Sequence, residues 1–431
     1  MGQPSKRKGD RIPIFFDVLE LKVRTIALAT AAKVVEGMLN ADTSDHRGAA
    51  RACSCGGIAH YRGRRAKTFM TVIGAITLHR AYYYCPDCKK GSFPRDDELG
   101  LQEYLSPGLQ RMLALTAATV SFQETEDLLK ELAGVTVTAK HAERTAESIG
   151  NDIAEDERST TQTQAPSSDT MYVGLDGTGI PMRAEELIGR VGKQADGSSK
   201  TREVKLVTVW TADGRDKDGI PERDEGSISY NAAIESAAMA NTDEQLSDFA
   251  RRVQRETERR GFDIAKRQVI IGDGAKWIWN IADELFPDAI QIVDLYHAKG
   301  TVSETAKNIF GPTSVIGQQK AKQWRDLLEQ GNIDQIINDL SAFSSCQDAS
   351  TCIKYLQTNR NRMQYPLFRT QGLCTSSGVV EAGCKTAVGA RLKQAGMHWS
   401  VNGSNAIIAL RCYKLSNRFD DYWNRRRLLY A

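Results

Sequence analysis

The chain has 431 residues, of which 41% are hydrophobic and 26% are charged, and its formal net charge is +3. This length suits about three domains of ~150 residues, so a single small fold and a disordered chain are both excluded. No apolar run approaches the ~18 residues that cross a bilayer, and the basic start is not followed by the apolar segment of a secretion signal. We therefore expect a cytoplasmic protein whose nine cysteines are reduced.

The first part of the chain predicts three modules in succession. Apolar residues at helical spacing predict a helical region within 1–50, and a β-rich segment with two cysteine pairs follows at 51–98. Residues 99–158 read as helical, with Ser106 as a cap in front of a proline. The small polar residues of 159–170 predict a linker.

Beyond the linker, the pattern is that of an α/β domain. Short β-branched runs alternate with helical segments over 171–298, which predicts a mixed or parallel sheet covered by helices. Residues 299–372 are mostly helical, and a basic segment follows. From Lys354 to Arg427 there are thirteen lysines and arginines but three acids. This excess predicts a polyanionic partner such as nucleic acid, with a solvated basic face as the alternative.

Two cysteine pairs predict a structural zinc site. Cys53 and Cys55 form a C-x-C pair, and Cys85 and Cys88 form a C-x-x-C pair at the far end of a predicted hairpin. Two thiolate pairs brought together by a loop supply the four ligands of tetrahedral zinc, and such a closed site is structural rather than catalytic. The alternative is four unrelated buried cysteines.

A helix-turn-helix is the next candidate. Residues 128–135 read as a helix and a glycine-containing turn, and a second helix is expected over 139–150. Lys140, His141 and Arg144 lie near the start of that second helix, where such motifs contact DNA. An ordinary pair of helices gives the same pattern.

Three acidic residues are candidates for a metal-dependent active site. Asp176 and Asp273 each follow an apolar strand and precede a glycine, which allows close approach to the backbone. Glu381 is the only acid between Asp348 and Asp420. Three such carboxylates can hold two Mg²⁺ ions about 3.5–4 Å apart for phosphoryl displacement. Taken singly, an Asp-Gly pair is usually only a turn.

Several segments carry a family resemblance. They are Asp176–Gly179, Gly189–Gln194 with Lys200–Lys205, Gly272–Ala275 with Trp277, Asp294–His297, and Gly378–Glu381 with Arg391–Trp399. In order and combination they resemble bacterial insertion-sequence transposases of the Kra-four family, a Mutator-like group of the DDE class. The resemblance covers nearly the whole chain, including the cysteine pairs and the helix-turn-helix.

The resemblance implies a fold and a set of site residues. The fold is an α/β RNase H-like catalytic domain, built from 171–298 and 373–431 and interrupted by an all-helical insertion at 299–372. The amino-terminal part supplies the helical, zinc-ribbon-like and helix-turn-helix modules. The implied catalytic triad is Asp176, Asp273 and Glu381, which bind two Mg²⁺ or Mn²⁺ ions, and Asp294 and His297 support it.

The implied activity is DNA transposition. The protein would bind the terminal inverted repeats of an insertion sequence, cleave the ends by metal-dependent hydrolysis and join the 3′-OH ends to target DNA. A homodimer on double-stranded DNA and association with the nucleoid are expected. Further DNA contacts are predicted at Arg190, Lys193, Lys200, Arg202, Lys385, Arg391, Lys393 and Trp399. The rival functions are a nuclease or resolvase without strand transfer, and a DNA-binding regulator with an inactive catalytic domain.

Overall fold

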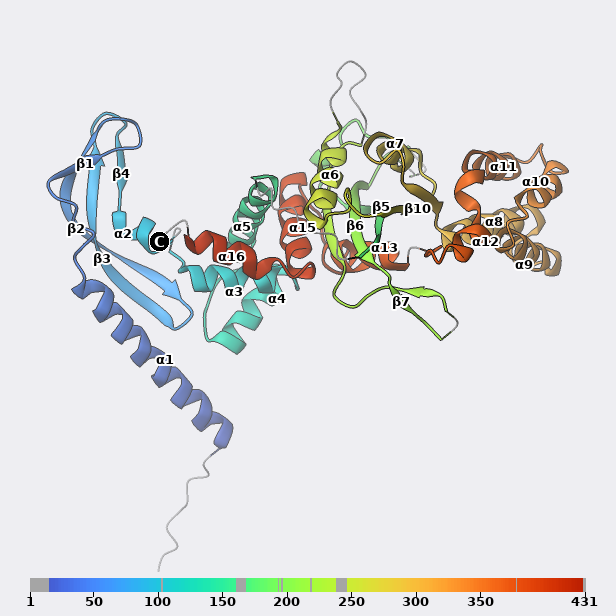
Figure 1. Ribbon diagram of the computed structural model, residues 1–431. Coiled ribbons are helices and arrows are strands. Elements are labelled where there is room, and N and C mark those ends of the chain that lie inside the picture. The colour runs from blue at the N-terminus through green and yellow to red at the C-terminus, as the bar shows by residue number, and fades with distance from the viewer. Residues whose placement is uncertain are drawn as a thin grey trace, which may run out of the picture. The chain divides into compact units, whose positions relative to one another are not determined.

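The computed structural model describes residues 15–101, 104–159, 168–192, 194, 197–217, 219–237, 246–376 and 378–428. The chain divides into two compact units, one formed by Met1–Thr145 with Trp423–Ala431 and the other by Ala146–Tyr422. Figure 1 shows the elements of each unit along the chain. Most of the predicted linker, residues 160–167, lies outside the described residues, as do residues 1–14.

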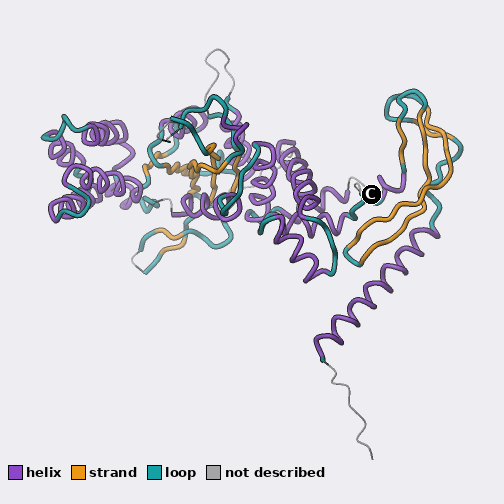
Figure 2. Tube along the Cα trace, turned by 180° about the vertical axis from the view of Figure 1, so that it is seen from behind, coloured by secondary structure: helices purple, strands orange, loops and turns teal. Residues whose placement is uncertain are grey.

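The first unit contains a long helix and an antiparallel sheet. Helix α1 spans Phe16–Ala41, and the strands β1 (Ala50–Ala52), β2 (Ile58–Thr71), β3 (Gly74–Cys85) and β4 (Lys90–Ser92) lie side by side in chain order. The β2–β3 hairpin is visible in Figure 2 as two long strands. The first half of strand β2 is rich in exposed polar residues, which give no apolar strand signal in the sequence.

One end of this hairpin packs against α1. Ala32 of α1 and three hairpin side chains, Phe69, Ile76 and Leu78, form a buried apolar cluster. The other end of the hairpin carries a separate small cluster that includes Tyr83 and the cysteines. The two ends are therefore stabilised by different groups of residues.

Helices complete the first unit. They are α2 (Pro94–Glu98), α3 (Pro107–Ala117), α4 (Phe122–Leu128), a π-helical turn (Leu129–Ala133), the start of α5 (Ala139–Ser159) and the end of α16 (Phe419–Leu428). Ser106 caps α3 as predicted, because its hydroxyl accepts a hydrogen bond from the Leu109 N–H at 3.3 Å. Ser121 and Glu124 form a reciprocal capping box at the start of α4.

Helix α5 is longer than the sequence predicted. The second helix of the helix-turn-helix was expected to end near Gly150, but α5 continues to Ser159. A Cβ atom on Gly150 would lie 2.2 Å from the carbonyl oxygen of Ala406, which belongs to α15 (Val401–Leu415). The glycine therefore permits close approach of two helices and does not mark a helix end.

The second unit is built on a mixed five-stranded sheet. Its order is β11 (Ile290–Val293), β10 (Arg267–Gly272), β5 (Thr170–Pro181), β6 (Thr201–Thr211) and β9 (Ser229–Ala233). Strand β6 is antiparallel to both β5 and β9, while β10 is parallel to both β5 and β11. The predicted α/β domain is therefore confirmed, and its sheet is mixed. Strand β9 was not predicted.

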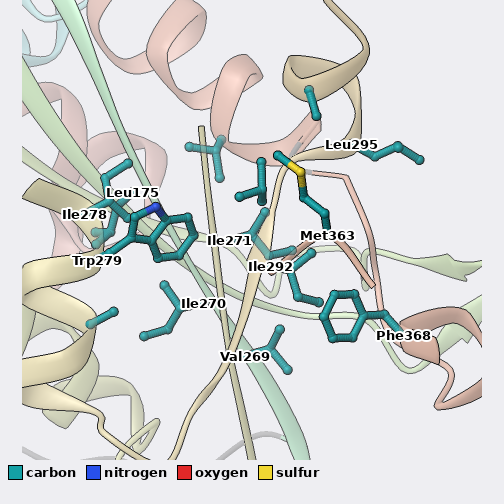
Figure 3. Packing of buried hydrophobic residues seen from close by; sticks show 14 of the residues in the cluster. Leu175, Val269, Ile270, Ile271, Ile278, Trp279, Ile292, Leu295, Met363 and Phe368 are labelled. Atoms are coloured by element: carbon teal, nitrogen blue, oxygen red, sulfur yellow. The ribbon is translucent and has the colours of Figure 1, made fainter. Parts of the chain in front are cut away.

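The parallel strands lie in the middle of the core. Val269, Ile270 and Ile271 of β10 are fully buried. In Figure 3, Trp279 of α7 (Lys276–Leu285) and Phe368 of α12 (Tyr365–Thr370) lie around this strand. Burial on both faces explains why β10 reads as a continuous β-branched run.

Helices account for most of the rest of the second unit. Helix α6 (Asp248–Arg260) precedes β10, and the segment after β11 is helical as predicted, with α8 (Leu295–Phe310), α9 (Val315–Glu329), α10 (Ile333–Ser341), α11 (Gln347–Asn359) and α12. The chain then forms α13 (Gly378–Gly383), a π-helical segment (Cys384–Gly389), α14 (Ala390–Leu392) and α15. Among the described residues, no helix is both long enough and apolar enough to span a bilayer.

Candidate functional site

Three aspartates stand in a row across neighbouring strands. Leu175, Gly272 and Val293 are partners in the register of β5, β10 and β11, and each is followed directly by an aspartate. Strands β10 and β11 end at this level, but β5 continues to Pro181 in a hairpin with β6. The sequence predicted that Asp176 follows the end of its own strand. Instead, Asp176 lies within β5, beside the end of β10.

These aspartates line a single cleft with residues from the helices. The cleft has a volume of about 390 Å³, and its walls include Asp176, Asp273, Asp294, His297 and Glu381. All five residues predicted for the catalytic and supporting roles are thus brought together from distant parts of the sequence. The cleft is also lined by Glu304, which the sequence analysis did not single out. Glu304 lies two helical turns after His297 on α8, and this spacing could have indicated that the two side chains share one face of the helix.

The two aspartates on β5 and after β10 are held by backbone N–H groups. Asp176 Oδ1 accepts from the Gly177 N–H at 2.6 Å, and Asp273 Oδ1 accepts from the Ala275 N–H at 2.8 Å. Burial raises the pKa of Asp176, and the nearby charge of Asp273 acts in the same direction. Hydrogen bonds from the Cys384 thiol and the Gly177 N–H oppose this rise. A nearby cation would favour the ionised form.

The remaining acids differ in how they are held. Asp294 is 7% exposed and caps α8, because its Oδ1 accepts from the N–H groups of Tyr296 at 2.6 Å and His297 at 3.1 Å. The Glu381 side chain is 67% exposed and pairs with Lys385 at 2.7 Å on the same helical face. Asp294 is thus fixed by the fold, whereas Glu381 is free to reorient toward a ligand.

Two tyrosines of the helical segment brace the strand ends that carry the aspartates. The Tyr355 hydroxyl of α11 donates to the carbonyl oxygen of Asp273 at 3.2 Å. The Tyr365 hydroxyl of α12 donates to the carbonyl oxygen of Val293, next to Asp294, at 3.1 Å. The helical segment therefore supports the cleft through the backbone.

A second candidate centre is formed by the four predicted cysteines. The Sγ atoms of Cys53 and Cys88 are 3.7 Å apart, as are those of Cys55 and Cys85, and all four lie within 4.8 Å of one another. Tetrahedral zinc with Zn–S bonds of ~2.3 Å requires S···S edges of ~3.8 Å, so the cluster fits a metal ion of this type. The cluster is one that can bind structural zinc.

The local backbone explains how a tight C-x-C pair reaches this geometry. The Cys53 N–H donates to the Gly57 carbonyl at 2.8 Å, and Gly56 has a φ of 88°, which favours glycine. The backbone N–H of Cys55 hydrogen-bonds the Cys53 sulfur and lowers the pKa of that thiol to about 7. A depressed pKa favours the thiolate form of Cys53, whereas the hydrogen bond with Cys53 raises the pKa of Cys55 and burial raises that of Cys88.

The predicted helix-turn-helix residues lie in the first turns of α5. The Thr138 hydroxyl accepts from the His141 N–H at 3.3 Å, so Thr138 caps the helix as predicted. Lys140 and Arg144 are exposed, and Lys140 pairs with Glu143 at 2.6 Å. His141 is half-buried, with its ring edge-on to Tyr104 at 4.3 Å between centroids.

Comparison with known proteins places the chain in a family. Residues 60–419 match the sequence profile of an uncharacterised protein family, UPF0236. The chain belongs to the UPF0236 family. No curated protein matches the sequence. Among solved structures, the Drosophila P element transposase strand transfer complex is similar with a TM-score of 0.25 and 9% identity, over 77% of this chain and 83% of that chain.

The UPF0236 match includes the whole carboxylate cleft but only part of the cysteine cluster. Asp176, Asp273 and Glu381 all fall within residues 60–419, as do Cys85 and Cys88. The first cysteine pair precedes the matched segment.

Two of the DNA contacts predicted between residues 190 and 202 of this UPF0236 protein line a further pocket. Arg190 and Lys200 are exposed, and Arg202 is half-buried with an ion pair to Glu186 at 3.7 Å. Arg190 and Arg202 line a pocket of about 720 Å³ together with lysines from β6 and α7. Lys193 lies outside the described residues.

The predicted contacts near the end of the UPF0236 match divide into two groups. Lys385 and Lys393 are exposed, and Lys393 donates a hydrogen bond to the Thr178 hydroxyl. Arg391 is fully buried, and Trp399 is buried with its indole N–H donating to the Leu392 carbonyl at 3.0 Å. The prediction that these last two contact DNA therefore needs correction, because their side chains stack on each other inside the protein.

Proposed function

We propose that this chain is a DDE transposase that binds the ends of an insertion sequence, cleaves them and joins them to target DNA. The observation that carries the proposal is the cleft in which Asp176, Asp273 and Glu381 meet. Asp176 lies within β5, Asp273 directly follows β10 and Glu381 lies on α13, so the three residues come from distant parts of the sequence. An arrangement of acids at one sheet edge is what a metal-dependent phosphoryl transferase requires.

The architecture of the second unit supports the RNase H-like fold in this proposal. Three antiparallel strands, β5, β6 and β9, are followed in the chain by the parallel strands β10 and β11 on the other side of β5. Helical residues between β11 and α13 match an all-helical insertion before the last catalytic helix. On this basis we retain the proposed segments 171–298 and 299–372 and a last segment that begins at 373, while the expected end of that segment at 431 is moved to 422 because residues 423–431 belong to the first unit.

The donor set of the cleft suits hard divalent cations. Carboxylate oxygens are the ligands that Mg²⁺ and Mn²⁺ prefer, and the Cys384 thiol hydrogen-bonds Asp176. Asp176, Asp273 and Glu381 would hold the two ions, which activate the attacking oxygen and stabilise the leaving one. Asp294 orients α8, and the exposed Lys385 and Lys393 would bind the phosphate backbone.

The amino-terminal unit has a separate role in the proposal. The cysteine centre would hold structural zinc, and Lys140 and Arg144 at the start of α5 would contact the terminal DNA. A protein that joins two ends must hold both, so the active form would be a homodimer on double-stranded DNA. A fragment ending near Arg158 would then prefer terminal DNA over random DNA.

Glu381→Gln tests the third catalytic carboxylate. The variant keeps the shape of the side chain but removes a charge from the cleft, so DNA binding should persist while cleavage and joining are both lost. Cleavage is measured with Mg²⁺ and with Mn²⁺ on a labelled duplex carrying the element end.

Asp294→Asn is the matched comparison. Asparagine also caps helices well, so α8 is preserved and this variant should retain more activity than Glu381→Gln. Near-normal cleavage by the Glu381 variant together with loss in the Asp294 variant would show that Asp294 is the third ligand. Cleavage without joining by the unaltered protein would instead favour the nuclease.

A further inference from the structure

The β2–β3 hairpin of the first unit lies in a segment of the chain without acidic residues. Between Asp45 and Asp87 there are seven lysines and arginines and no aspartate or glutamate. Cations that cluster in this way raise the local positive potential unless carboxylates from other segments lie beside them. The partners of the individual cations therefore decide where positive charge remains.

Two arginines of β2 have no compensating carboxylate. Three of the seven cations are neutralised, and these pairs are Arg47–Glu98 at 2.6 Å, Arg64–Asp45 at 2.8 Å and Arg80–Asp96. Arg62 and Arg65 are exposed, and their side chains have neither an ion pair nor a hydrogen bond among the residues that the structure describes. An anion from outside the chain can therefore reach both guanidinium groups.

A β-bulge places these two arginines next to Tyr82 in the hairpin. The register shifts within β2, so that two residues, Arg62 and Gly63, lie opposite Tyr82 alone. Gly63 has a φ of 90°, which favours glycine. Because the extra residue reverses the alternation of side chains beyond it, Arg65 lies opposite Arg80 and shares the face of Tyr82. Without the bulge, Arg65 would point to the other face.

Tyr82 holds the guanidinium group of Arg65 in place. The Arg65 Cζ atom lies 3.7 Å from the centroid of the Tyr82 ring, and Phe93 packs on the same ring at 5.0 Å between centroids. A Cβ atom on Gly91 would lie 2.4 Å from the Tyr82 ring, so the ring lies directly over the backbone of β4. A guanidinium stacked on a ring keeps the N–H groups in its plane available to an anion. A cation that is already ordered loses less entropy when it binds.

We propose that the Tyr82 face of the hairpin, formed by Tyr82, Arg62 and Arg65, binds the phosphate backbone of double-stranded DNA. The proposal rests on the proposed function, which supplies DNA as the polyanion, and it adds a DNA-binding surface separate from the start of α5. Arginine pairs with phosphate through short, charge-assisted hydrogen bonds. Phosphate contacts position DNA without reading its sequence, so this surface binds duplexes of any sequence.

The test measures binding of a fluorescein-labelled duplex of random sequence to the full chain by anisotropy at increasing NaCl. Arg62→Gln and Arg65→Gln should each lower the slope of log K against log salt by ~0.9, and each should weaken binding about fivefold near 0.15 M NaCl. The double variant should lower the slope by ~1.8. Arg65→Lys keeps the charge and should retain the slope, whereas a loss caused by altered packing on Tyr82 would not be restored by lysine.

Lys33→Gln is the matched control. The Lys33 side chain is 77% exposed, pairs with Glu36 at 2.8 Å and lies on α1, next to Ala32 in the cluster at the other end of the hairpin. This variant should bind DNA with the slope of the unaltered protein, and equal midpoints of urea denaturation show that all variants are folded. If Arg62→Gln and Arg65→Gln leave the slope unchanged, or if Lys33→Gln lowers it as much, the proposal is overturned.

Failure of the transposase proposal would give a different result. A protein whose DNA binding depends on Arg62 and Arg65 but which never cleaves duplex DNA with Mg²⁺ or Mn²⁺ would contradict the proposed catalysis and leave the DNA-binding surface in place. A protein that cleaves DNA, and whose binding does not depend on either arginine, would remove the surface and leave the catalysis.

Discussion

Replacing Cys85 by serine should remove the metal ion and loosen one end of the β2–β3 hairpin. Cys85 is buried within the cluster of four sulfurs, and the apolar residues buried beside it are Ala59, Ala81 and Tyr83. Only Tyr83 is large, and burying one such side chain contributes roughly 1.5–3 kcal/mol. Zinc held by small domains contributes about 10–16 kcal/mol at neutral pH. The metal, and not the apolar cluster, is therefore expected to stabilise this end.

The effect should be local. Zinc binding is expected to stabilise this end by at least about 5 kcal/mol more than the apolar cluster does. When zinc binding is lost, the protection of backbone amides in β1 and β4 against hydrogen exchange should therefore fall by about 10³-fold or more. The opposite end of the hairpin should keep its protection, because Phe69, Ile76 and Leu78 pack on α1 without the metal.

Elemental analysis and hydrogen exchange check this prediction. The unaltered protein should contain about one zinc per chain, and Cys85→Ser should lose zinc and protection in β1 and β4 together. Cys346→Ser is the control, because Cys346 lies outside the four-sulfur cluster and should change neither. Unchanged zinc content in Cys85→Ser, or unchanged exchange after chelation, would refute the reasoning.

Three further substitutions test packing, capping and support of the cleft. Gly150→Ala should destabilise the protein by about 1–3 kcal/mol in urea denaturation despite the better helix propensity of alanine, because the added Cβ meets the Ala406 backbone; increased stability would contradict the close approach. Ser121→Ala should cost about 1 kcal/mol by loss of the capping box, while Ser121→Asn should be nearly neutral in the same assay. Tyr355→Phe leaves the Asp273 carbonyl without its donor and should reduce metal-dependent DNA cleavage at unchanged DNA affinity; full cleavage would show that this hydrogen bond does not position the cleft.

Local signals in the sequence predicted the elements that depend on local physics. Ser106 caps α3, and Gly261 ends α6 in the left-handed conformation, as expected for those residue types. Of the two tryptophans on α7, Trp279 is buried and Trp277 is half-buried, because residues two positions apart on a helix point to different faces. The β-branched run of β10 was also recognised.

Strand β9 could not be recognised because its burial depends on distant partners. Its residues include Ser229 and Asn231, which are polar and yet buried. The Ser229 hydroxyl donates to Glu256 at 2.6 Å, and Asn231 Oδ1 accepts from Arg252 at 2.7 Å. Helix α6 satisfies these groups, so an apolar pattern was not needed to bury the strand.

The carboxylate cleft was predictable in its members but not in its geometry. Asp176 and Asp273 were selected from their glycine neighbours, Glu381 was selected as the only acid between Asp348 and Asp420, and the family resemblance supported all three. The structure brings them into one cleft. That Asp176 lies within a long strand depends on the β5–β6 pairing, which no local pattern reveals. The burial of Arg391 was missed for the same reason, because a cation in a basic segment looks like a surface residue.

The order in which the cleft residues occur along the chain has a consequence during synthesis. Strands β5, β6 and β9 are translated before Asp273, and Glu381 follows Asp273 by roughly a hundred residues, which takes about 5–20 s at typical translation rates. A nascent chain therefore carries an incomplete set of carboxylates until the helical segment and α13 have emerged. The proposed cleavage activity would thereby be absent while the chain is still on the ribosome, and truncated products that end before α13 lack the complete set of carboxylates.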